Sequence, residues 1–368
     1  MKLHIFNPEH DLALVSTDGL FTPPHAARNL RRDLGFLPAL WAEDGDLVLV
    51  DDTEAALEMV RHVKSFAADV VFVTLADLSL LNADSIRQLK VSPWGWDMML
   101  TRQLVHTNNT FVQVVQDKTS VDNIRTMSNR RFASEHLLPY LCSLDSSFVG
   151  RAVYLDNLDS VISEIETNGK SVVKAPWSCS GRGVRYVEHT LEQPLIGWCR
   201  NILSRQGGLM VEPYYDKVED FGMEFIATAN GRVEYKGLSI FKTVNGSYAG
   251  SIIASEREKL EILSRYVDTT IIAKIRDGVI HRMQYFIDGR YVGPFGIDLM
   301  IVADDTRKRF LIHPCVELNL RRTMGHVALA LHNSVADPQR LMTIRYDGKY
   351  HLRISTTNEN VLNTSLSV

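Results

Sequence analysis

The chain has 368 residues, which is enough for two or three domains that each bury a substantial core. Its apolar share of 45% and charged share of 23% are typical of globular proteins and exclude a largely disordered chain. The formal charge of −4 argues against a broad basic face, so we expect no nucleic-acid partner.

Three features of the sequence bear on the cellular location of the protein: its first residues, its apolar runs and its cysteines. Residues 1–6 lead directly into a polar segment, without the apolar core of a signal peptide. No apolar run approaches the roughly 20 residues of a membrane helix. We therefore expect a cytoplasmic protein without membrane contact. The four cysteines form no CxxC pair, which favours reduced thiols over a disulfide framework or a zinc ribbon.

Strand-like and helix-like patterns alternate in the first hundred residues. The β-rich runs occupy 3–6, 46–51 and 69–74, and helical patterns occupy 24–34 and 53–66. Strands separated by helices of this length predict βαβ units and a parallel sheet. A polar stretch at 106–120 ends the alternation. We predict a first domain over 1–115 and a second over 116–368.

The second domain begins with mixed patterns and continues mainly as β-structure. We predict helices over 121–127, 129–141, 158–166 and 193–205, and a helical or irregular stretch over 256–278. Predicted strands occupy 149–154, 171–175, 184–187, 209–212, 221–228, 232–241, 251–255, 283–288, 293–302 and 309–320. Because 171–175 and 184–187 are so close in sequence, residues 176–183 are predicted to be the loop of a hairpin.

Residues 172–184 read VVKAPWSCSGRGV and place Lys174 on a strand before a loop of small residues. A P-loop is excluded, because position 164 is Glu and a strand follows Gly169 where a helix is needed. A dinucleotide fingerprint is excluded, because its third glycine would fall at Tyr186. The loop could bind phosphates through backbone N–H groups beside a fixed lysine charge, or it could be a plain surface hairpin.

A second candidate segment is VEPYYD at 211–216, which follows a short apolar strand. Main-chain groups of such a segment can hydrogen-bond an adenine between two lobes. A nearby carboxylate, Glu219 or Asp220, can accept from ribose hydroxyls. A Pro-Tyr turn after a core strand explains the same residues without a ligand.

Three oxygen-bearing side chains lie on the last two predicted strands. Asp298 interrupts the apolar run FGIDLMIV, while Glu317 and Asn319 share one face of HPCVELNL. If Asp298 pairs with Cys315 in a hairpin, Asp298 and Glu317 face the same way, roughly 7–8 Å apart on the diagonal. A register shifted by one residue puts them on opposite faces. Oxygen ligands without clustered cysteine or histidine favour Mg²⁺ or Mn²⁺ over zinc.

The order of the candidate motifs resembles that of the ATP-grasp superfamily of ligases. The motifs are Lys174 with its loop, then Glu212-Pro-Tyr-Tyr, then Asp298, then Glu317-x-Asn319-x-Arg321. No single motif is specific for this superfamily, but the ordered set of motifs at this spacing is. The resemblance spans nearly the whole chain. It implies an open α/β domain followed by a two-lobed ATP-grasp fold, with a smaller lobe near 145–210 and a larger lobe over 211–368.

The resemblance also implies roles for individual residues. Lys174 and Arg321 would be catalytic, at the ATP phosphates and at the transferring phosphoryl group. Mg²⁺ would be bound by Asp298, Glu317 and Asn319. The nucleotide would be held by Arg131, Lys174, Ser178, Ser180, Gly181, Gly183, Glu212, Tyr214, Tyr215 and Glu219 or Asp220. The sequence departs from the family in two ways: Arg130 and Arg131 stand near a usual lysine, and Leu320 replaces a frequent proline.

The implied reaction is phosphoryl transfer from ATP to a small-molecule carboxylate, followed by attack of an amine on the acyl phosphate. Two other interpretations stay open, an ATP-binding regulatory protein without ligase activity and an α/β nucleotide-sugar or dinucleotide enzyme acting through its first domain. Residues 7–11, NPEHD, follow the first predicted strand and could bind the acceptor or contact another lobe. Further candidate acceptor contacts are Lys236, Lys242, Tyr248, Arg322 and residues 323–326. The sequence leaves the substrates and the oligomeric state open.

Overall fold

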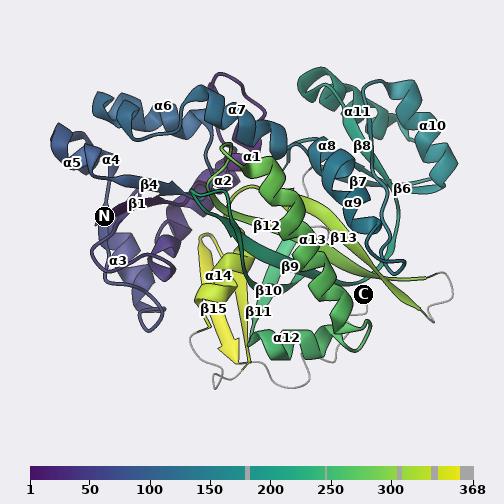
Figure 1. The fold of residues 1–368 in the computed structure, drawn as a ribbon. Helices are drawn as coiled ribbons and strands as arrows, with labels where there is room; N and C mark the ends of the chain where they lie inside the picture. Colours follow the sequence, from purple (N-terminus) through teal and green to yellow (C-terminus); the bar gives the residue numbers. More distant parts are fainter. Residues whose placement is uncertain (179–182, 245–246, 305–308, 333–338, 357–368) are drawn as a thin grey trace.

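A four-stranded parallel sheet, in the order β3-β2-β1-β4, lies in the amino-terminal part of the chain (Figure 1). The computed structural model describes residues 1–178, 183–244, 247–304, 309–332 and 339–356. The strands of this sheet are β1 (Lys2–Ile5), β2 (Leu47–Leu49), β3 (Val71–Val73) and β4 (Lys90–Pro93). The predicted strands at 3–6, 46–51 and 69–74 and their parallel pairing are confirmed. The short run KVSP of β4 gave too little pattern to be predicted.

Helices connect and cover these strands. They are α1 (His10–Ala13), α2 (His25–Leu34), η1 (Leu37–Leu40), α3 (Thr53–Arg61), α4 (Leu75–Ser79), α5 (Ala83–Arg87), α6 (Met98–Thr107) and η2 (Asn109–Gln113). Asp52, one residue before the predicted start, caps α3 by accepting from the backbone N–H groups of Glu54 and Ala55. A run of α7 (Lys118–Met127), α8 (Arg130–Phe132), η3 (Ala133–Leu137) and α9 (Leu138–Cys142) then leads to the next sheet.

A second sheet of four strands has the order β5-β8-β6-β7. Its strands are β5 (Val153–Leu155), β6 (Lys170–Lys174), β7 (Val184–Glu188) and β8 (Leu209–Pro213), and its helices are α10 (Leu158–Asn168) and α11 (Gln193–Gln206). Lys174 of β6 lies opposite Val184 of β7 in an antiparallel pair, so the predicted hairpin is confirmed. The middle of its loop, 179–182, lies outside the described residues.

The third sheet is antiparallel and has the order β13-β12-β9-β10-β11-β14-β15. It contains β9 (Asp216–Ala227), β10 (Val233–Val244), β11 (Ser247–Ile253), β12 (Gly293–Ala303), β13 (Phe310–Asn319), β14 (Arg340–Tyr346) and β15 (Tyr350–Thr356). The helices α12 (Glu256–Leu263), α13 (Thr269–Ile287) and α14 (Met324–Ala330) lie against it (Figure 1). The pair β14–β15 was not predicted from the sequence.

The strand predicted at 283–288 is wrong, because helix α13 continues through these residues to Ile287. The buried side chains of α13 include Ile275, Val279, Met283 and Ile287, which recur every four residues. This spacing is helical, and it is visible only when the whole element is considered. A window of six residues could not separate the end of this buried helix from a strand.

The described part of the chain contains no helix with the length and apolar character needed to cross a membrane. Its largest apolar cluster joins α13 to the seven-stranded sheet, where Phe225 and Phe295 stack with ring centres 5.1 Å apart and both are fully buried. Tyr235 packs edge-on against Phe225. This aromatic contact packs the strands β9, β10 and β12 of the seven-stranded sheet together.

We predict that Phe225→Ala lowers the free energy of unfolding by about 3–5 kcal/mol, because it leaves a cavity beneath the stacked Phe295 ring. Urea unfolding followed by fluorescence measures the change. Leu80→Ala is the control, since Leu80 is 84% exposed and its loss should change stability by less than about 0.5 kcal/mol. Equal effects of the two substitutions would contradict this account of the core.

Candidate functional site

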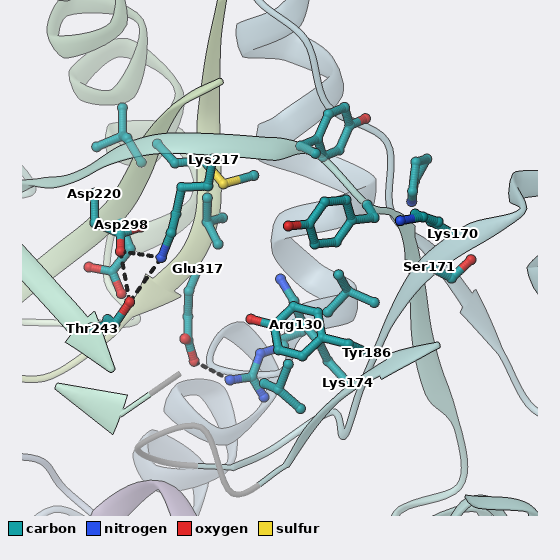
Figure 2. A pocket seen from close by; sticks show the side chains of 18 of the residues that line it. Arg130, Lys170, Ser171, Lys174, Tyr186, Lys217, Asp220, Thr243, Asp298 and Glu317 are labelled. Carbon is teal, nitrogen blue, oxygen red and sulfur yellow. Dashed lines mark hydrogen bonds and ion pairs between the residues drawn. The ribbon is translucent and has the colours of Figure 1, made fainter. Parts of the chain in front are cut away.

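A cavity of about 560 Å³ lies between the second and third sheets (Figure 2). Strand β6 contributes Val172 and Lys174, which are two residues apart and therefore share one face. Leu299 and Met300 of β12 form the opposing apolar wall, and Tyr186 of β7 lies at the edge. An apolar slot with a lysine at one end suits a flat heterocycle that carries an anionic group.

Lys174 is the buried cation of this cavity. Its Nζ lies 2.7 Å from Oε2 of Glu212, and each side chain is only 8% exposed. The residues that line the cavity do not include Glu212, although the sequence predicted that Glu212 helps to hold the adenine. Glu212 lies opposite Val172, on the same face of the sheet as Lys174, and its carboxylate pairs with the ammonium group.

Asp298 and Glu317 are directly opposite each other on β12 and β13. The predicted partner of Asp298 was Cys315, but a bulge between Asp298 and Met300 shifts the register at this point. The two carboxylates therefore share a face, as expected, and are closer than the predicted diagonal. Burial, together with the charges of Glu317 and Glu224, raises the pKa of Asp298 well above its usual value.

The arrangement of oxygens fits a hard divalent cation better than any other metal. No group of three or more His, Cys, Asp or Glu side chains suited to a metal occurs among the described residues. Asp298 and Glu317 supply two carboxylates, and the amide of Asn319 lies 3.1 Å from Oδ2 of Asp298. Mg²⁺ is commonly held by one or two carboxylates together with substrate phosphates. A cation here would also offset the burial and the repulsion by Glu317 that raise the pKa of Asp298.

Arg130, and not the predicted Arg131, lines the cavity. Its Nη2 donates to Oε1 of Glu317 at 2.6 Å, and its Nη1 donates to the carbonyl of Ala175 and to Oγ of Ser178. The guanidinium of Arg131 points elsewhere, because it pairs with Glu135 and stacks over Tyr154. The two residues start a helix, so neighbouring side chains leave it about 100° apart and only one can face the cavity.

Arg321 has several partners, one of which lies near the start of the sequence. Its Nε donates to both carboxylate oxygens of Asp11, at 2.9 and 2.8 Å, and Nη2 lies 2.7 Å from Oδ2. Nη2 also donates to Oδ1 of Asn319. Burial alone would raise the pKa of Asp11, but the charge and hydrogen bonds of Arg321 outweigh it and hold that pKa below its usual value.

The other predicted nucleotide contacts divide into three groups. Tyr214, Tyr215 and Asp220 line the cavity, and Asp220 accepts from Thr243 at 2.9 Å. Glu219 is buried in an ion pair with Lys242 and does not appear in the lining. Ser180 and Gly181 lie outside the described residues.

Ser178 and Gly183 form the described ends of the predicted phosphate loop. Ser178 is buried and accepts from Arg130. A Cβ atom at Gly183 would lie 2.3 Å from Cβ of Ser178, so glycine allows the two ends of the loop to approach closely. The glycine at 183 therefore has a packing reason that is independent of any phosphate.

A second cavity, of about 220 Å³, opens on the other side of the acid pair. It shares Phe241, Thr243, Asp298 and Glu317 with the first cavity, and Arg321 lines it. Among the candidate acceptor contacts, Tyr248 and residues 323–325 line this second cavity. Lys236 pairs with Glu234, Lys242 with Glu219, and Arg322 lies over Trp41.

Residues 7–11 connect the amino-terminal sheet to this second cavity, which Pro8 and Asp11 line. Asn7 donates to the carbonyl of Gly95 and to Asp97, so the segments after β1 and β4 are joined. The expectation that this motif contacts another lobe agrees with the Asp11–Arg321 pair. Sequence reasoning named Arg130 only as an alternative to Arg131, and it missed the aliphatic wall of Leu299 and Met300. The alternation of Val172 with Lys174 on β6 was a usable signal for the apolar lining.

No protein-family model matches the chain, and a search of curated proteins finds no match either. Solved structures resemble it over most of its length. The N5-carboxyaminoimidazole synthetase of Staphylococcus aureus with ADP superposes with a TM-score of 0.52 at 11% identity, covering 97% of this chain and 93% of that one. A biotin carboxylase from Campylobacter jejuni, in a β-γ-ATP complex, gives 0.52 at 14% identity, covering 93% and 75%.

The chain therefore has the fold of the ATP-grasp superfamily, and the predicted fold class is confirmed. Both neighbours were crystallised with adenine nucleotides. At these identities the likeness concerns the fold alone.

We predict that Asp11→Asn lowers the free energy of unfolding by about 3–5 kcal/mol, because it leaves the buried Arg321 charge without its carboxylate. A double-mutant cycle with Arg321→Gln, read by urea unfolding, should give a coupling energy above about 1 kcal/mol. The exposed pair Lys118–Asp122 is the control and should couple by less than about 0.5 kcal/mol. Additive effects of the Asp11 and Arg321 substitutions would contradict a direct interaction.

Proposed function

We propose that the chain is an ATP- and Mg²⁺-dependent ligase that activates a small-molecule carboxylate as an acyl phosphate for attack by an amine. One observation carries this proposal: two cavities meet at Asp298 and Glu317, with Lys174 and Arg130 on one side and Arg321 on the other. A phosphoryl group passing from one cavity to the other would cross the point where these charges converge.

The first cavity is proposed to hold the nucleotide. Its aliphatic walls suit adenine, Asp220 and Thr243 suit the ribose hydroxyls, and Lys174 suits the phosphates. Arg130 would contact the phosphates from the opposite side, in place of the lysine usual in the family. Tyr214 and Tyr215 would lie at the hinge between the sheets.

The acid pair is proposed to hold Mg²⁺ through Asp298 and Glu317, with Mn²⁺ as a substitute. Asn319 would join them once its amide, whose nitrogen donates to Asp298 and whose oxygen accepts from Arg321, turns its oxygen to the cation. A metal bound there would neutralise phosphate charge and orient the terminal phosphoryl group. Arg321 is oriented by Asp11 toward the second cavity, where the carboxylate would bind. Its positive charge would be available to the phosphoryl group as it is transferred.

The reaction would proceed in two displacements. A carboxylate oxygen attacks the γ-phosphorus and ADP leaves, which gives the acyl phosphate. The amine then attacks the acyl carbon, loses a proton and expels inorganic phosphate. No side chain needs to act as a covalent nucleophile, and the protein mainly positions groups and balances charge.

We predict that Mg-ATP raises the melting temperature and that Arg130→Gln weakens ATP binding by about tenfold, because a charge-assisted contact with phosphate is lost. Arg131→Gln is a matched control one residue away and should bind as wild type does. Isothermal titration calorimetry measures both. Equal weakening by both variants, or an unchanged wild-type melting curve in millimolar Mg-ATP, would count against the assigned nucleotide cavity.

The activity itself is tested by ADP release with pooled carboxylates and amines, followed by mass spectrometry for a new amide. ADP release that requires both a carboxylate and an amine would support the proposed ligase activity. Tight Mg-ATP binding without release under any pool would instead favour an ATP-binding regulatory protein.

We also predict that the affinity for Mn²⁺ in the presence of ATP rises with pH. The raised pKa of Asp298 means that this carboxyl keeps its proton at a pH where an ordinary carboxyl is ionised, so the cation must displace a proton. Affinity should rise by up to about tenfold per pH unit until the carboxyl is ionised. Asp298→Asn should bind weakly and lose the dependence, as followed by electron paramagnetic resonance.

A further inference from the structure

A third cavity, of about 520 Å³, lies in the amino-terminal part and shares no lining residue with the two cavities of the candidate site. Helices α2 and α6 form two of its walls, and Glu9 and Asp51 line it from the segments that follow β1 and β2. The carboxyl ends of parallel strands are where open α/β sheets bind ligands. The position of the cavity is therefore that of a binding site.

The two helices present basic side chains to this cavity. Helix α2 contributes Arg28 and Arg31, which are three residues apart and lie on one face. Helix α6 contributes Arg102 and His106, which are four apart and likewise share a face. Basic faces on both walls repel each other unless an anion lies between them.

One of these arginines is fixed by its neighbours. Nη1 of Arg31 donates to Oε1 of the buried Glu9 at 3.1 Å, and Nη2 donates to Gln103 at 3.4 Å. Because Arg31 pairs with Glu9, the negative charge of Glu9 is already balanced. Asp51 is the other acidic residue among those that line the cavity. Arg28 and Arg102 line the same cavity.

Arg28 and Arg102 have the freedom to bind a ligand. Both side chains are exposed, and neither has a side-chain hydrogen bond or ion pair within the part of the chain that the structure describes. The acid near Arg102 is Asp18, whose pKa is lowered by hydrogen bonds from Leu20 and Ser16 and, more weakly, by the charge of Arg102. Gly19 approaches the stem of Arg102 so closely that a Cβ atom there would lie 3.0 Å from Cδ and 2.8 Å from the carbonyl oxygen of Met98. This glycine has a φ of +73° and packs the loop onto α6 beside the arginine.

We propose that this cavity binds a small molecule through an oxyanion group, a phosphate or a carboxylate, held between Arg28 and Arg102 in front of Arg31. Guanidinium groups match the geometry of both oxyanions through paired N–H donors. The volume exceeds what a free ion needs and suits an organic molecule that carries the group. This site is separate from the proposed ligase site and does not depend on its activity.

Isothermal titration calorimetry of the full chain tests the proposal, with sodium phosphate and sodium succinate as separate probes and chloride holding the ionic strength constant. We expect saturable binding of at least one probe, and the stronger one tells whether the natural group is a phosphate or a carboxylate. Arg28→Gln and Arg102→Gln should each weaken it by about tenfold. The two lie on different helices, so misfolding of one variant leaves the other as a test.

Two controls separate this site from general attraction and from the ATP cavity. Arg61→Gln removes an exposed arginine of α3 outside the cavity and should leave binding unchanged. Lys174→Gln alters the ATP cavity and should also leave it unchanged. The proposal is overturned if neither probe saturates, if Arg61→Gln weakens binding as much as Arg102→Gln does, or if only Lys174→Gln abolishes it. None of these outcomes depends on ADP release.

Discussion

Two carboxylates, those of Asp298 and Glu317, face each other across adjacent strands, and the rest of the site compensates for their repulsion. Like charges directly opposite in a sheet are destabilising, and burial strengthens the effect. Arg130 donates to Glu317, and the amide of Asn319 donates to Asp298. A divalent cation between the carboxylates would complete this compensation, which is the physical basis for proposing a metal here.

The same compensation links distant parts of the chain. Asn319 is held by Arg321, and Arg321 is held by Asp11, which is 310 residues away in sequence. Asp11 follows β1, so the orientation of the arginine depends on how the amino-terminal sheet docks (Figure 1). The anion-binding cavity proposed between α2 and α6 lies on the same amino-terminal unit, beyond Glu9 and Arg31.

Much of the fold and part of the site could be predicted from local pattern. Short β-rich runs separated by helical segments indicated the parallel sheet, and the hairpin carrying Lys174 followed from two strands close in sequence. The end of α13 was misassigned, because six residues do not display a helical period. Arg131 was chosen over Arg130 because adjacent residues at a helix start are equivalent until the neighbouring sheet is placed.

The sequence by itself determined which chemical groups are present, their order, and the strands that carry most of them, because strand alternation and turn residues act over a few positions. Only the tertiary structure decided that Asp298 lies opposite Glu317, that Glu212 supports Lys174, and that Asp11 orients Arg321. These contacts depend on a bulge, on burial and on docking between segments far apart in the chain. No local pattern encodes them, since each results from the packing of whole elements.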